Sequence, residues 1–173
     1  ADSILAACKN SGLPFHLRIL FELNRKLRSY ESPRISNTVD DALKLLFDTL
    51  ESLHGSEITG AVIGYILSSR RKGLRESEIL SLLRFDESFW NRFVERSHPA
   101  HREEIKRMDS LPFIVWSRFR TELDPYLTEC GSDGEPLLSF FHRLIGEYSE
   151  KRYMNMMSYR LLLQYFMNIK TEE

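Results

Sequence analysis

Short apolar runs at helical spacing, each interrupted by glycine or proline, constrain this sequence more than any other feature. The clearest run follows Thr38, where apolar residues recur three and four positions apart: Val39, Ala42, Leu43, Leu46, Phe47, Leu50 and Leu53. Thr38 can cap this helix, and Asp41 completes a variant of the capping box. His54-Gly55 then supplies a stop signal. The pattern predicts a protein built from several short helices.

The same spacing predicts helices on both sides of this run. Residues 1–29 are predicted to form two helices that turn at Gly12-Leu13-Pro14, because Gly can end a helix and Pro can begin one. The polar stretch 32–37 is the best linker candidate. Residues 97–110 are charged and aperiodic, which predicts an exposed loop. Further helices are expected over 56–72, 76–83, about 89–93, 112–123, about 141–152 and 158–168.

One stretch departs from helical spacing. Two apolar runs, 126–130 and 135–140, flank Gly131-Ser132-Asp133-Gly134, and an Asp-Gly between apolar runs is a strong hairpin signal. Several short helices followed by a hairpin are typical of a winged helix, a relative of the helix-turn-helix with a two-stranded wing. The predicted fold class is therefore mostly α, with a winged-helix domain that carries one β-hairpin wing.

Composition argues against several classes of protein. Apolar residues make up 42% and charged residues 28% of the 173, which is usual for a globular domain. The net charge of −1 favours neither nucleic acid nor an anionic membrane as a partner. No apolar run approaches the roughly 20 residues that span a bilayer. Cys8 and Cys130 lie far apart, which indicates reduced thiols and a cytoplasmic location.

The sequence contains no complete catalytic or metal-binding constellation. No Gly-Lys dipeptide occurs, so the phosphate loop of many ATPases is absent, and G-x-S-x-G is absent as well. His98 and His101 precede Glu103 and Glu104, but Pro99 breaks the helix that would align the two imidazoles. We therefore expect no metal site, and we expect that this chain is not an enzyme on its own.

The residues themselves leave two functions to be weighed. A winged helix can bind DNA through a recognition helix rich in cations and polar side chains. Residues 76–83 instead contain Glu76 and Glu78, with cations only at the ends, Arg75 and Arg84, which makes nucleic acid an unlikely partner. The other alternative is a helical scaffold for protein partners.

Four stretches and their order carry a resemblance to a known family. They are "SGLPFHLRILFELNRKLRSY", "LHGSEITGAVIGYILSSRRKGLRESEILSLL", "LPFIVWSRFRTELDPYL" and "DGEPLLSFFHRLIGEYSEKRY", and the tail "YRLLLQYF" extends them. Together they resemble the region behind the nucleotide-binding core of NACHT-type STAND ATPases, nearest to those with WD40 or TPR arrays, including bacterial antiviral members. The resemblance covers nearly the whole chain.

The resemblance implies a helical lid over 1–34, a winged-helix domain over 35–157 and a trailing helix over 158–173. It implies that Pro14 packs near the adenine of a bound nucleotide. It also implies that His142 reaches the β-phosphate of ADP and holds the module closed. ATP or ADP with Mg would then be cofactors of the full-length protein, with none bound by this chain alone.

The partners implied by the resemblance are the NACHT core and a downstream repeat domain in cis. The resemblance also implies that exchange to ATP opens the protein and that the open protein forms a homo-oligomer. The sequence departs from the family pattern at Arg75, where a Thr or Ser cap is expected, so the helix after it should begin more weakly.

Overall fold

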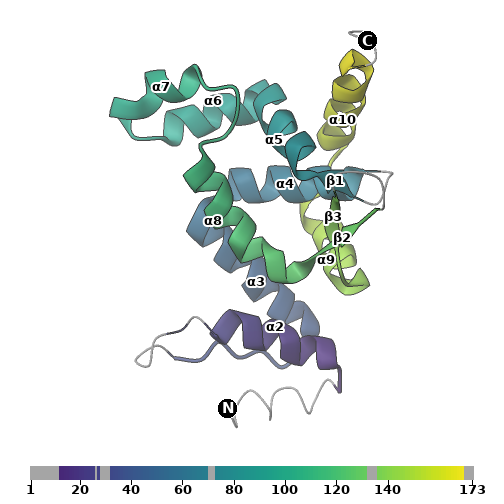
Figure 1. Ribbon diagram of the computed structural model, residues 1–173. Helices are drawn as coiled ribbons and strands as arrows, with labels where there is room; N and C mark the ends of the chain where they lie inside the picture. The colour runs from purple at the N-terminus through teal and green to yellow at the C-terminus, as the bar shows by residue number, and fades with distance from the viewer. Residues whose placement is uncertain (1–11, 26, 28–31, 70–72, 132–135, 170–173) are drawn as a thin grey trace. The chain divides into compact units, whose positions relative to one another are not determined.

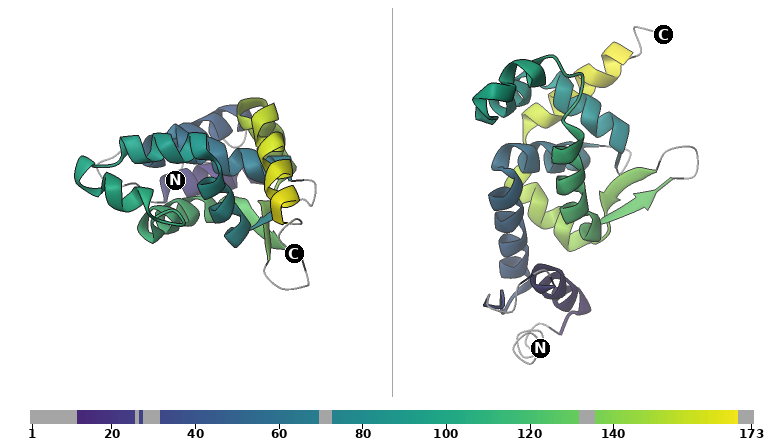
Figure 2. Two further views of the ribbon diagram at one scale, coloured as in Figure 1. Left: turned by 90° about the horizontal axis from the view of Figure 1, so that it is seen from above. Right: turned by 60° about the vertical axis from the view of Figure 1, so that its left-hand side comes forward.

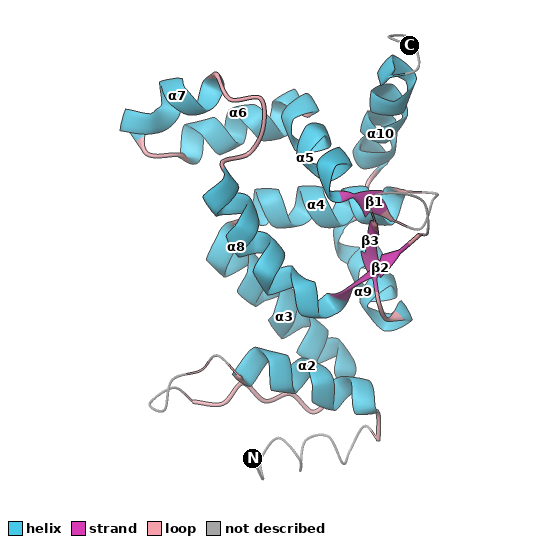
Figure 3. Ribbon diagram, in the orientation of Figure 1, coloured by secondary structure: helices cyan, strands magenta, loops and turns pink. Residues whose placement is uncertain are grey.

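A computed structural model describes residues 12–25, 27, 32–69, 73–131 and 136–169 of the chain. The fold is mostly helical with a small sheet, as the sequence predicts (Figures 1 and 3). Packing divides the chain into two compact units, residues 1–53 and 54–173. The segments predicted from the sequence, 1–34, 35–157 and 158–173, are a functional division and stay a prediction.

The first unit contains helices α2 (Pro14–Asn24) and α3 (Val39–His54). The predicted cap of α3 is confirmed, since the Asp41 N–H donates to Thr38 Oγ1 at 3.1 Å and the Thr38 hydroxyl donates to the Asp41 carboxylate at 2.7 Å. Each helix buries one apolar face: Phe15, Ile19, Leu20 and Leu23 on α2, and Ala42, Leu43, Leu46, Phe47 and Leu50 on α3.

The connection between α2 and α3 is hydrogen-bonded to both helices. Asn24 accepts from the Arg34 N–H at 2.7 Å and donates to the Arg34 carbonyl at 2.8 Å. The Arg34 guanidinium donates to Thr49 Oγ1 at 2.9 Å. His16, which is fully buried, bonds Ser36 Oγ at 3.1 Å, and burial lowers the pKa of its imidazole. The candidate linker is thus held in place within the first unit.

Helix α4 (Ser56–Ser68) lies at the centre of the second unit. It is apolar on almost every side, which is expected of a helix covered by neighbours all round. Four helices pack on it: α5 (Glu76–Phe85), α6 (Glu87–Arg96), α9 (Arg143–Tyr153) and α10 (Met156–Ile169). At Gly64 a Cβ would lie 2.9 Å from Ser158 Oγ, so the small residue is required where α10 crosses α4.

The sheet has three antiparallel strands in the order β1-β3-β2. The predicted hairpin is confirmed as β2 (Leu127–Cys130) and β3 (Leu137–Phe140), with Leu127 opposite Phe140 and Cys130 opposite Leu137. Residues 132–135 of its turn lie outside the described residues. The hairpin extends from the helices in Figure 2. The strand β1 (Leu74–Arg75) was not predicted, because two residues carry no periodicity; it pairs with β3 through Leu74 and Leu138.

Two predicted boundaries differ from the structure. Helix α4 ends at Ser68 rather than near 72, and residues 70–72 lie outside the described residues. The exposed loop predicted over 97–110 is wrong, since it contains a 3-10 helix, η1 (Pro99–His101), and helix α7 (Arg102–Lys106). Ile105 is buried there, and one apolar residue in a charged run gives no helical pattern to detect.

Two further elements complete the second unit. Helix α8 (Phe113–Leu123) begins after Pro112, as predicted, and the 3-10 helix η2 (Asp124–Tyr126) leads from it into β2. Helix α10 begins at Met156, two residues before the predicted start. Among the described helices, none has the length and apolar character that a bilayer-spanning segment needs.

Candidate functional site

Pro14, the residue predicted to lie near an adenine, is the first residue of α2. Leu13 precedes it in an extended conformation, and Gly12 has a positive φ of 63°, which suits glycine. Proline is favoured at this position because its missing N–H would have no partner within the helix. The Pro14 ring is exposed, so it is available for contact with another group.

His142, the residue predicted to reach a phosphate, caps the start of α9 directly after β3. Its backbone is extended, and its ring Nδ1 accepts a hydrogen bond from the Leu144 N–H at 3.2 Å. A neutral imidazole has one donor and one acceptor nitrogen, so this bond assigns the proton to Nε2. The half-buried ring also lies edge-on to Phe141, with ring centroids 5.9 Å apart. The local geometry therefore makes Nε2 a hydrogen-bond donor.

Pro14 and His142 belong to different compact units. Each residue is therefore described within its own unit, at the first turn of α2 and at the start of α9. That the two residues line one nucleotide pocket stays a prediction. No group of three His, Cys, Asp or Glu side chains within the described ranges is arranged to hold a metal ion.

Arg120 joins three elements at the sheet side of the second unit. Its guanidinium lies 3.7 Å from Glu76 at the start of α5 and 3.7 Å from Glu129 on β2, and it also pairs with Asp124. The Glu76 carboxylate accepts a second bond, from the Trp116 indole N–H at 2.6 Å. Because the Arg120 side chain is only 16% exposed, these carboxylates replace its hydration. We call these five residues the Arg120 cluster.

Arg75 does begin α5 without a capping side chain. The Glu78 carboxylate accepts from the Arg75 N–H at 2.8 Å, so one half of a capping box is present. At the other end of this helix, Arg84 donates to the Met108 carbonyl at 3.0 Å and lies 4.7 Å above the Trp90 ring. The Arg84 guanidinium, one of the two cations at the ends of this helix, is thus engaged within the protein.

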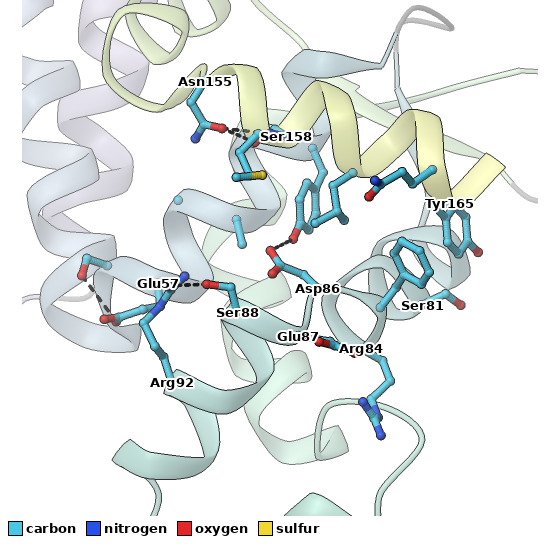
Figure 4. Close-up of a pocket in the computed structure, with 18 of the residues that line it drawn as sticks. Glu57, Ser81, Arg84, Asp86, Glu87, Ser88, Arg92, Asn155, Ser158 and Tyr165 are labelled. Carbon is cyan, nitrogen blue, oxygen red and sulfur yellow. Dashed lines mark hydrogen bonds between the residues drawn. The ribbon is translucent and has the colours of Figure 1, made fainter. Parts of the chain in front are cut away.

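A groove of about 1240 Å³ lies elsewhere in the second unit. Side chains of α4, α5, α6 and α10 line it, and Figure 4 shows how they converge. At its centre, the Tyr65 hydroxyl donates to Asp86 Oδ2 at 2.7 Å, while Asp86 Oδ1 caps α6 by accepting from the Phe89 N–H at 2.9 Å. Burial and the Asp86 carboxylate both raise the pKa of Tyr65, so its hydroxyl stays protonated.

Sequence reasoning missed both the groove and the Arg120 cluster. The groove residues come from segments up to about 110 positions apart, from Ser56 to Tyr165. The Arg120 cluster likewise combines Glu76 with Glu129. The spacing of residues in one element cannot predict which distant elements will meet. The one available signal was Asp86, a carboxylate directly before an apolar helical run and therefore a cap candidate.

Comparisons with known proteins relate the chain to one family. NACHT domain- and WD repeat-containing protein 1 is 32% identical over 155 residues in Homo sapiens and 31% identical over 155 residues in Mus musculus. NACHT and WD repeat domain-containing protein 2 of Mus musculus is 26% identical over 165 residues. These matches cover 89%, 89% and 91% of this chain, and 10%, 10% and 9% of the relatives.

The chain therefore spans about a tenth of the length of the curated relatives that it matches. No family model matches the chain, and no solved structure matches it. The resemblance predicted from the four quoted stretches is confirmed by these matches, which extend over both compact units. Over about nine tenths of its own length, the chain is thus similar to NACHT and WD repeat-containing proteins.

Proposed function

We propose that this chain is a regulatory, non-catalytic part of a NACHT ATPase and couples the ADP or ATP state to opening and oligomerisation. The family relationship supports this proposal, because the names of the relatives describe proteins with a NACHT domain and WD repeats. In the proposal, the chain acts between these two kinds of domain, which are its partners in cis.

The observation that carries the proposal is the position of His142 between β3 and α9. Because Nδ1 is occupied by the Leu144 N–H, Nε2 is the nitrogen that can donate to a phosphate oxygen. The α9 backbone turns here from strand to helix, which fixes the direction of the ring. The residues present thus suit contact with a nucleotide phosphate, and Pro14 offers an apolar ring for an adenine.

The element order supports the interpretation of the second unit as a winged helix. Helix α4, strand β1, helix α5, helix α8 and the β2–β3 hairpin occur in this order, with α6, η1 and α7 inserted between α5 and α8, and β1 joins the edge of the hairpin. In the proposal this unit moves as one body, since the Arg120 cluster ties α5, α8 and the hairpin together.

One hydrogen bond from His142 would bias the closed state without determining it. A hydrogen bond to a charged group contributes about 1.5–3 kcal/mol, which corresponds to roughly ten- to a hundredfold in an equilibrium. Moving a population from almost all closed to almost all open requires about 5.5 kcal/mol. Packing between domains would have to supply the remainder.

The test uses the full-length protein that contains this chain. His142→Ala should lower the ADP that remains bound after purification by about tenfold and raise basal oligomerisation. Bound nucleotide is measured by chromatography of the denatured protein, and assembly by light scattering. His101→Ala is the matched control, because His101 is exposed in η1. If His142→Ala retains as much ADP as the control and assembles to the same extent, the proposed role is wrong.

Pro14→Ala tests the other half of the predicted site. Alanine is accepted in the first turn of a helix, so α2 should persist while the ring is lost. In the proposal, Pro14→Ala weakens ADP and ATP binding to a similar extent, whereas His142→Ala acts mainly on ADP. Equal effects of both variants on both nucleotides would contradict the separate roles assigned to them.

A further inference from the structure

The groove of the second unit is too large for an ordinary small-molecule pocket. Drug-sized ligands occupy pockets of about 300–1,000 Å³, and this groove measures about 1240 Å³. It is partly open to solvent, and residues of α10 and of the junction of α5 and α6 line it (Figure 4). These dimensions suit a segment of polypeptide.

Apolar side chains that a partner could cover line one part of this groove. Phe85 is 37% exposed and Met157 is 64% exposed. The Phe85 ring lies edge-on to Tyr165, with ring centroids 5.8 Å apart, and Leu161 lies one turn before Tyr165 on α10. An aromatic pair with a flexible methionine is a surface on which apolar side chains of different shape can pack.

The walls of the groove determine how a peptide can bind. Almost all lining residues belong to helices α4, α5, α6 and α10, whose backbone groups bond within each helix. An extended peptide would find no strand edge there to pair with. Binding must therefore use side chains, as an amphipathic helix does when it lays its apolar face in a groove.

The charges around the groove favour a basic partner. Four carboxylates and two guanidiniums line it. Glu57 pairs with Arg96, and Arg84 turns away toward the Met108 carbonyl, as Figure 4 shows for its guanidinium. Neither Glu87 nor Asp109 has an ion-pair partner among the residues that the structure describes. Both are exposed, so they can attract a cation without first breaking an internal bond.

We propose that this groove binds a basic amphipathic helix of a partner protein. The apolar face of that helix packs on Phe85, Met157, Leu161 and Tyr165, and its Lys or Arg side chains pair with Glu87 and Asp109. This surface lies apart from His142 and does not depend on nucleotide binding. It would let the second unit receive a protein signal independently of the proposed ADP contact.

The test measures binding of two synthetic helical peptides to the 173-residue chain by fluorescence anisotropy. One peptide has Leu and Lys at helical spacing, and the other has Glu in place of each Lys. We expect the Lys peptide to bind at least about tenfold more tightly. The double variant Glu87→Lys with Asp109→Lys should reverse this preference. Glu103→Lys with Glu104→Lys, on α7 outside the groove, is the matched control and should retain it.

A second variant tests whether the peptide binds in the groove by partly blocking the groove with a large side chain. Ser81→Trp puts a large side chain at the exposed rim of the groove and should weaken binding of the Lys peptide by at least about tenfold. Asn91→Trp, exposed on α6 and absent from the lining, should not. Equal affinity for both peptides, binding of neither, or equal losses in groove and control variants would overturn the proposal. Circular dichroism verifies that each variant is folded.

Discussion

The two ends of α5 differ in how their charged side chains are used. At the start of the helix, Glu76 bonds the Trp116 indole and faces Arg120, which also meets Asp124 and Glu129. At its end, the chain passes through Phe85 and Asp86 into a groove where Glu87 has no ion-pair partner in the described ranges. Charge engaged internally stabilises a junction between elements, whereas charge left in solvent beside apolar side chains is available to a partner.

Close contact between backbones should make the region at the start of α5, beside the sheet, less tolerant of substitution than the groove at its end. Gly73 has a φ of 152°, and a Cβ there would lie 2.6 Å from the Leu138 carbonyl oxygen. We expect Gly73→Ala to lower the free energy of unfolding by about 3 kcal/mol or more, because β1 must separate from β3. Urea unfolding followed by tryptophan fluorescence measures this in the second unit, since both tryptophans, Trp90 and Trp116, lie there.

Gly146→Ala is the control for the Gly73 substitution. Gly146 is helical in α9, and a Cβ there would have no atom within 4 Å. Alanine should therefore raise the free energy of unfolding, by up to about 1 kcal/mol, through helix propensity. Similar losses of stability at both glycines would contradict the role assigned to the close approach of β1 to β3.

A substitution in the Arg120 cluster should have the next largest effect on the free energy of unfolding. Arg120→Met should lower the free energy of unfolding by about 2 kcal/mol, because the hydrogen bond to Asp124 and the ion pairs with Glu76 and Glu129 are lost and three carboxylates are left facing one another. Arg92→Met at the groove should change it by less than about 0.5 kcal/mol, since Arg92 is exposed and bonds only the Ser88 hydroxyl among described residues. The same urea titration compares the two, and equal losses would contradict the contrast between the two sides.

Tyr65→Phe should have a smaller effect near neutral pH than Gly73→Ala or Arg120→Met, a loss of about 1 kcal/mol for one buried hydrogen bond to Asp86. The pH dependence is more specific. The pKa of Tyr65 is raised in the folded state, so an unfolded chain loses this proton first, near pH 10. The stabilisation is therefore complete below pH 10 and decreases as pH rises above it.

Unfolding midpoints in urea at pH 8 and at pH 10.5 measure this dependence. The wild-type chain should lose more stability between the two values than Tyr65→Phe does. The seven tyrosines all contribute to the wild-type decrease, so the difference between the two chains is the informative quantity. An identical decrease in both would mean that the hydroxyl of Tyr65 titrates as freely in the folded state as in the unfolded one.

Helices with strong local signals could be predicted from the sequence. Thr38 and Asp41 cap α3 as predicted, Pro14 and Pro112 stand at helix starts, and β2 and β3 pair on either side of the stretch that contains the Asp-Gly dipeptide. Capping, proline geometry and hairpin formation act over a few residues, so local sequence contains the information. Pro14 and His142 were identified by resemblance, and their shared role stays a prediction.

Other features depend on contacts between elements that are distant in the sequence. The two-residue strand β1 exists because β3 supplies its hydrogen-bond partners, and α7 is helical around a single buried Ile105. The groove and the Arg120 cluster each combine side chains from helices far apart in sequence. An acidic residue has the same local pattern whether it is paired with Arg120 or, among the described residues, left without an ion pair beside Phe85. Its surroundings in three dimensions determine which of the two it becomes.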